Sequence, residues 1–115
     1  MMPTRLLIVL AFIGSTSAEL VHVTDLGMRI APGFEITHYA DSVIAPDVYS
    51  MTLDPSGSVV ISSRGYIKRL TDEDGDGSAE TEAMVIESRT GAMGMLFLDE
   101  RTLLTTEGGY FNRYN

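Results

Sequence analysis

The stretch MTLDPSGSVVISSRGYIKRL (residues 51–70) decides the fold, because a second copy of its pattern follows in the chain. The segment MLFLDERTLLTTEGGYFNRY (95–114) aligns with it without a gap at an offset of 44 residues. Gly65, Tyr66 and Arg69 have identical counterparts in the second copy, and apolar positions fall opposite apolar positions. Self-similarity at a fixed period is the sequence signature of a repeat architecture. We therefore expect two structural repeats with matching elements.

Each repeat predicts short strands. The run SVVIS (58–62) is β-branched and too short for a helix. A turn with Pro and Gly in favourable positions precedes it at 54–57. No segment after Ala18 has a convincing helical period, so the fold class is predicted to be all-β. Beyond 58–62, strands are expected at 34–40, 50–53, 66–70, 83–86, 93–98, 102–106 and 109–114.

A period of 40–50 residues with about four short strands per unit is typical of a β-propeller blade. A propeller closes with roughly four to eight blades, whereas residues 34–115 hold about two, with repeat units around 51–70 and 95–114. Two blades alone would leave open sheet edges and an unclosed core. We therefore predict a partial β-propeller over 34–115, whose partners are the remaining blades of a longer chain. The alternative is a small, self-contained β-sandwich.

The first eighteen residues have the pattern of a secretory signal peptide. Arg5 supplies a positive charge, 6–13 is an unbroken apolar run, and 14–18 offers small residues that end in Ala18. The apolar run is far shorter than the roughly 20 residues of a membrane-spanning helix. We expect a signal-peptide helix at 1–18, a lead-in at 19–33, and an exported protein that is periplasmic, extracellular or membrane-associated. Retention of the uncleaved peptide is the alternative.

The composition limits the partners. The net charge of −8 argues against nucleic acid, whose binding depends on Lys and Arg. The same charge suits divalent cations. The chain has no cysteine, so it must gain its stability from a core, from a metal or from further protein.

The segment DEDGDGSAE (72–80) predicts a metal site. Its alternate carboxylates occupy the first, third and fifth positions of a calcium loop, and Gly77 permits a sharp turn. An EF-hand would require a bidentate Glu where this chain has Ala83, and the flanks are strands, so an inter-strand site with a structural role is expected. The alternative is a solvated acidic turn held by its own hydrogen bonds. The predicted calcium ligands are Asp72, Asp74, Asp76, Ser78 and Glu80.

No residue is assigned a catalytic role. His22 and His38 lack a second histidine at ligand spacing, and the segment SSRG at 62–65 does not match a nucleophile motif. Four methionines are interpreted as core filling, namely Met51, Met84, Met93 and Met95.

Residues 41–80 resemble the opening of the propeller domain in bacterial PVC-type membrane-bound dehydrogenases, which are similar to glucose/sorbosone dehydrogenase and NHL-like propellers. The likeness rests on the pattern A-P-x-x-x-S-M-x-x-D-P-x-G at 45–57, on R-G-Y-I at 64–67, and on the D-x-D-G-D-G loop at 72–77. It continues through GAMG at 91–94 and covers nearly all of the chain from about Phe34.

The resemblance implies an extracytoplasmic, six-bladed propeller. Characterised propellers related to this family use pyrroloquinoline quinone with calcium to oxidise sugars or alcohols. The chain has no cysteine and therefore no covalent haem site. It also ends before the later blades, where related quinoproteins place their catalytic and cofactor-binding residues. The resemblance thus implies a calcium-stabilised scaffold, inactive by itself, within an oxidoreductase. The alternative is a non-enzymatic propeller that binds protein or glycan.

Overall fold

The computed structural model describes residues 18–115, and the chain divides into two units, Met1–Ile36 and Thr37–Asn115. The signal-peptide helix predicted at 1–18 falls outside the described residues, apart from Ala18. The second unit begins three residues after the predicted start of the propeller segment at 34. Between residues 18 and 115, no helix is long and apolar enough to cross a membrane.

The lead-in forms a small hairpin that was not predicted. Strands β1 (Val21–Val23) and β2 (Met28–Ile30) pair antiparallel, and the 3-10 turn η1 (Thr24–Leu26) joins them. Gly27 closes the turn in the left-handed region, where its N–H donates to the Thr24 carbonyl over 3.2 Å. Each strand has three residues, which is too short for a sequence pattern to reveal.

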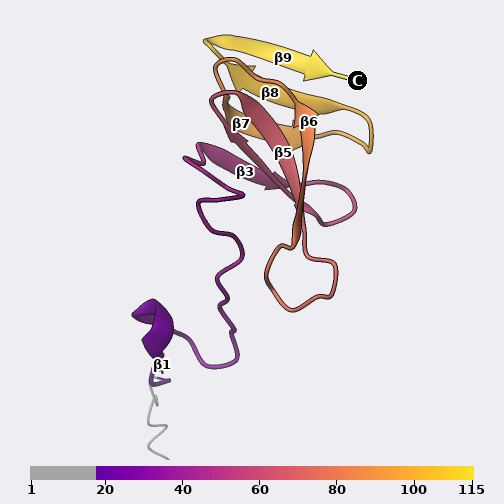
Figure 1. Ribbon diagram of the computed structural model, residues 1–115. Helices are drawn as coiled ribbons and strands as arrows, with labels where there is room; N and C mark the ends of the chain where they lie inside the picture. The colour runs from indigo at the N-terminus through magenta and orange to yellow at the C-terminus, as the bar shows by residue number, and fades with distance from the viewer. Residues whose placement is uncertain (1–17) are drawn as a thin grey trace, which may run out of the picture. The chain divides into compact units, whose positions relative to one another are not determined.

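The unit Thr37–Asn115 is built from two antiparallel meanders (Figure 1), and the predicted all-β class is confirmed for the described residues. The first sheet has the order β3–β4–β5–β6, where β3 is Ser50–Leu53, β4 is Val59–Ser63, β5 is Tyr66–Thr71 and β6 is Thr81–Ile86. The second sheet has the order β7–β8–β9, where β7 is Ala92–Phe97, β8 is Leu103–Glu107 and β9 is Tyr110–Tyr114.

The sequence repeat has the same strands and the same register in both sheets. β8 and β9 begin 44 residues after β4 and β5. Ser62 pairs with Ile67 in the first sheet, and their counterparts Thr106 and Phe111 pair in the second. The turns before β4 and β8 also match: the N–H of Asp54 donates to the Ser58 carbonyl, and the N–H of Leu98 donates to that of Thr102, each over 2.9 Å.

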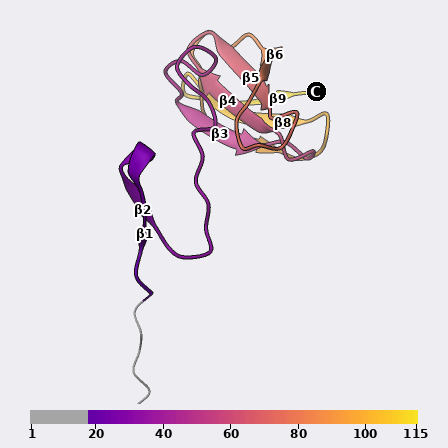
Figure 2. The same ribbon diagram turned by 60° about the horizontal axis from the view of Figure 1, so that its bottom comes forward.

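The two sheets pack against each other around a shared apolar core (Figure 2). Val60 and Ile67 of the first sheet are fully buried beside Ala92 and Leu103 of the second. Burial of a Val or Ile side chain stabilises a fold by about 1.5–3 kcal/mol. Partly buried side chains extend this core, namely Val85, Ile86, Met95, Phe97 and Tyr114.

Two serine hydroxyls of the first sheet hold the backbone of Ala92. The Ser50 hydroxyl donates to the Ala92 carbonyl over 2.7 Å, and the Ala92 N–H donates to the Ser62 hydroxyl over 2.7 Å. The connection before Ala92 passes through Gly91, which is buried and has a φ of 77°. A Cβ added at Gly91 would lie 2.8 Å from the Ser63 carbonyl carbon, so the junction between the sheets requires glycine.

The prediction of a strand at 34–40 is wrong, because these residues form no strand in the structure. Tyr39 and Ala40 pack onto Ile61 and Leu70, on the face of the first sheet that points away from the second. The alternating pattern therefore belongs to a segment that covers the sheet. It is hydrogen-bonded to the loop between β5 and β6, and it pairs with no strand.

The interpretation of the methionines as core filling is wrong for three of the four. Met95 is partly buried against the core, but Met51 is 64% exposed, Met84 54% and Met93 70%. Met51 lies on the face of the first sheet that points away from the second, beside the part that Tyr39 and Ala40 cover.

Candidate functional site

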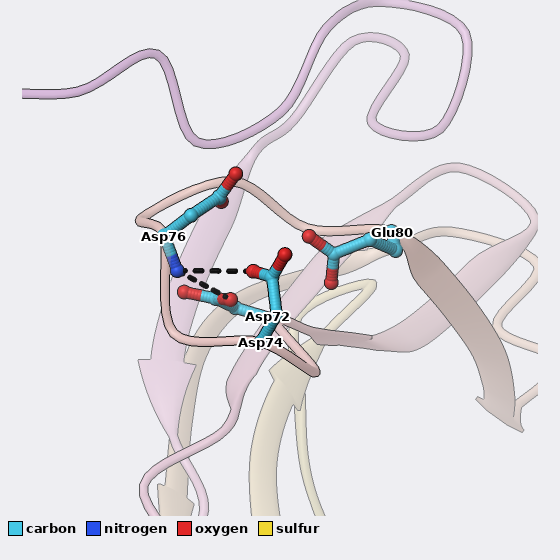
Figure 3. Close-up of side chains that lie close together, drawn as sticks. All are labelled: Asp72, Asp74, Asp76 and Glu80. Carbon is cyan, nitrogen blue, oxygen red and sulfur yellow. Dashed lines mark hydrogen bonds between the residues drawn. The ribbon is translucent and has the colours of Figure 1, made fainter.

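The predicted metal loop connects β5 to β6 and brings four carboxylates together (Figure 3). One oxygen from each of Asp72, Asp74, Asp76 and Glu80 lies within 4.8 Å of the others. Asp72 is half-buried and the other three are exposed. Glu80 points toward Asp72 from the far side of the loop. The residues 72–80 are called the acidic loop below.

Backbone N–H groups hold the acidic loop in shape. Asp72 accepts hydrogen bonds from the N–H groups of Gly75, Asp76 and Gly77, over 2.6, 3.2 and 2.9 Å. Gly75 and Gly77 have φ angles of 76° and 88°, a region that favours glycine. The alternation of Asp and Gly thus lets the chain turn around the Asp72 carboxylate.

A segment from the start of the same unit clamps the loop from outside. The Thr37 hydroxyl donates to the Gly77 carbonyl over 2.6 Å, and the N–H of Ala79 donates to the Tyr39 carbonyl over 2.8 Å. A Cβ added at Gly77 would lie 2.8 Å from two side-chain atoms of Thr37, so the clamp also requires glycine at this position. This contact joins residues forty positions apart, and the sequence pattern did not reveal it.

The donor set fits a calcium ion. Asp72 already accepts three backbone hydrogen bonds, which leaves one of about four lone-pair sites, while Asp74, Asp76 and Glu80 each accept one. Every carboxylate therefore retains an oxygen lone pair, and oxygen ligands of this kind are those that calcium takes.

The carboxylates of the cluster take part in no ion pair among the described residues. Within residues 18–115 the ion pairs are Lys68–Glu82 and Arg69–Asp54, and neither includes a carboxylate of the cluster. Two unit charges 4–5 Å apart repel by about 1 kcal/mol even in bulk water. Burial, and then the negative charges of Asp72 and Glu80, raise the pKa of Tyr39. A divalent cation would relieve this repulsion.

Ser78, the fifth predicted ligand, is not part of the carboxylate cluster and makes hydrogen bonds of its own. Its hydroxyl donates to the His38 carbonyl over 3.2 Å, and its N–H donates to Asp76 over 2.8 Å. Its side chain thus serves the clamp, and a contribution to metal binding by its carbonyl stays a prediction.

A buried carboxylate outside the loop was missed by the sequence analysis. Glu107 is 8% exposed and accepts hydrogen bonds from the hydroxyls of Ser88, Thr105 and Tyr114, over 3.0, 3.0 and 3.1 Å. Burial, and then the hydrogen bond to Glu107 and its charge, raise the pKa of Tyr114. The Ser88 hydroxyl also accepts the N–H of Gly91 over 3.0 Å. This cluster therefore ties the junction between the sheets to β8 and β9.

Comparison of the chain with protein-family models, with curated proteins and with solved structures gave no match. The resemblance to PVC-type dehydrogenases therefore depends on the quoted motifs alone.

Proposed function

We propose that this protein is a calcium-stabilised scaffold segment of an exported β-propeller. The single observation that carries the proposal is the repeated meander, with the same strand register at an offset of 44 residues and the two sheets packed face to face. Consecutive four-stranded sheets around a common centre are the plan of a propeller. In this plan β7–β9 represent three strands of a second blade.

The acidic loop is the proposed calcium site, with a structural role. It connects β5 to the edge strand β6 of the first sheet, and the segment 37–39 is hydrogen-bonded to it. An ion held by its carboxylates would join β5, β6 and this segment at one point. The ordering of exposed loop residues by calcium would then stabilise the whole unit.

We assign no catalytic step to residues 37–115. In a complete propeller of the kind that the resemblance implies, quinone-dependent oxidation of a sugar or alcohol would be carried out by groups on other blades. The acidic loop does not distinguish such an enzyme from a non-enzymatic propeller that binds protein or glycan, because its role would be structural in both.

Isothermal titration with calcium tests the site. The wild-type chain should show one binding site, and Asp74→Ala should abolish it, because Asp74 provides one of the four clustered carboxylates. Glu73→Gln is the matched control, since Glu73 lies in the same loop outside the cluster and accepts the Thr81 hydroxyl. The absence of any binding heat with the wild-type chain would refute the calcium site.

A further inference from the structure

Residues 37–45 lie against the first sheet and are called the strap below. Tyr39, Ala40 and Ala45 of the strap pack against a buried apolar cluster on the side of the sheet that faces away from the second sheet. The strap itself pairs with no strand. The cluster is therefore covered by a segment that no ladder holds in place, and it consists of Ile61, Tyr66 and Leu70.

The chain just after the strap is fixed to the first sheet. The Tyr66 hydroxyl donates to the Pro46 carbonyl, and the Ser63 hydroxyl donates to the Asp47 carbonyl over 2.8 Å. Asp47 has a φ of 50°, a left-handed conformation that is uncommon for a residue other than glycine. Such a conformation persists where the surrounding structure imposes it. Residues 46 and 47 thus give the strap a fixed pivot.

The opposite end of the strap is held by the acidic loop. In the part of the chain that the structure describes, the hydrogen bonds from residues 37–40 reach only residues 77–79. The bonds of Thr37 and Ala79 are the two shorter ones, at 2.6 and 2.8 Å. Ala79 also packs against the cluster that the strap covers. The strap is therefore attached at its far end to the acidic loop alone.

The contact between the strap and the loop is incompletely filled. A hollow of about 340 Å³ lies between them, lined by strap residues and by Ser78 and Ala79. The bonds made by the Thr37 and Ser78 hydroxyls lie at exposed positions. Segments with few buried contacts and solvent-exposed hydrogen bonds open locally while the rest of a protein stays folded. The strap has these properties, so a change in the loop can release it without unfolding the sheets.

We propose that the acidic loop holds the strap closed over the first sheet, and that calcium bound by the loop strengthens this hold. The attachment rests on the hydrogen bonds between strap and loop, whereas the control by calcium rests on the proposed calcium site. Without an ion, the four clustered carboxylates repel one another and loosen the loop. The strap then turns about residues 46 and 47, which uncovers Ile61 and Leu70.

Calcium acts on the strap because the metal ligands and the attachment belong to the same few residues. Asp76 and Glu80 flank residues 77–79, which bind the strap. An ion that holds these two carboxylates also fixes the backbone between them. A ligand that binds only the closed form lowers the open fraction by a factor of about 100 at a concentration of 100 times its Kd.

Limited proteolysis with chymotrypsin, which cleaves after Tyr and Phe, measures the opening of the strap. Tyr39 packs against the buried cluster, so cleavage after Tyr39 requires an open strap, and its rate follows the open fraction. Phe34 is 75% exposed and lies outside the strap, so cleavage after Phe34 is the internal reference. Mass spectrometry distinguishes the products that begin at Glu35 and Ala40.

The attachment is tested with and without calcium. Thr37→Val removes the donor to the Gly77 carbonyl, and it should speed cleavage after Tyr39 by about 2- to 10-fold. Thr81→Val is the matched control, because the Thr81 hydroxyl donates to Glu73, outside both the strap and the carboxylate cluster. This control should be cleaved at the wild-type rate. Equal rates of cleavage after Tyr39 in the two variants under both conditions would overturn the attachment.

The control by calcium is tested on the wild-type chain and on Asp74→Ala. Saturating calcium should slow cleavage after Tyr39 in the wild-type chain by about 10- to 100-fold relative to cleavage after Phe34. Asp74→Ala should show no slowing, because it lacks one of the clustered carboxylates. Binding heat without slowing would overturn the control by calcium and support the calcium site. No binding heat would overturn both the site and the control, and Thr37→Val would then decide the attachment alone.

Discussion

The hydroxyl of Ser62 should be the most sensitive polar group at the contact between the two sheets. Ser62 and Ala92 are both 0% exposed, and the hydroxyl is the partner of the Ala92 N–H over 2.7 Å. Ser62→Ala would leave this N–H buried without an acceptor, which costs about 1–3 kcal/mol. The second bond of the hydroxyl, to the Tyr66 carbonyl over 3.4 Å, is long and adds little.

Thermal unfolding followed by circular dichroism measures this loss. For a domain of 60–100 residues, a loss of about 2 kcal/mol lowers the Tm by roughly 8–16 °C. Thr106→Ala is the matched control, because Thr106 is the counterpart of Ser62 in the second sheet and is exposed. It should change the free energy of unfolding by less than about 0.5 kcal/mol. Equal losses in the two variants would refute the reasoning.

Two further predictions concern the acidic loop and the pH dependence of stability. In chemical denaturation, Gly77→Ala should destabilise the chain more than Gly75→Ala. Both glycines have a positive φ, but only a Cβ at Gly77 would meet the Thr37 side chain. Equal losses of unfolding free energy in the two variants would contradict the clamp. Burial alone would raise the pKa of Asp54, but hydrogen bonds from Ser56, Ser58 and Arg69 outweigh it and lower that pKa. The ionised Asp54 therefore stabilises the fold above the ordinary aspartate pKa of about 4, and this stabilisation is lost as the pH falls through its own lower pKa. In urea denaturation, the free energy of unfolding of Asp54→Asn should depend less on pH below about 5 than that of the wild-type chain. An unchanged acid profile would refute this.

Local features of the sequence predicted most of the second unit. The run at 58–62 became β4 at Val59–Ser63, because a β-branched stretch after a Pro–Gly turn has few other conformations. The carboxylates of Asp72, Asp74, Asp76 and Glu80 meet because alternate positions on one tight loop are close whatever the rest of the chain does. These successes depend on interactions between residues that are near each other in sequence.

The failures involve long-range contacts. The segment 34–40 alternates as a strand would, yet its partners are a loop forty residues away and a sheet face, so no ladder forms. Glu107 is an ordinary charged residue at the end of a strand pattern. Its burial depends on Ser88, nineteen residues earlier, and on Tyr114, which folds back beside it. Neither contact leaves a periodic signal in the sequence.

The connection through Gly91 has a consequence for any larger assembly. Its positive φ, its close approach to Ser63 and its bond to Ser88 leave the second sheet little freedom to rotate against the first. In an array of identical steps, the rotation at one step is multiplied by the number of steps, and it decides whether the last unit meets the first. A slight change of angle at Gly91 would therefore convert a ring into a spiral, although each individual contact could remain almost unchanged.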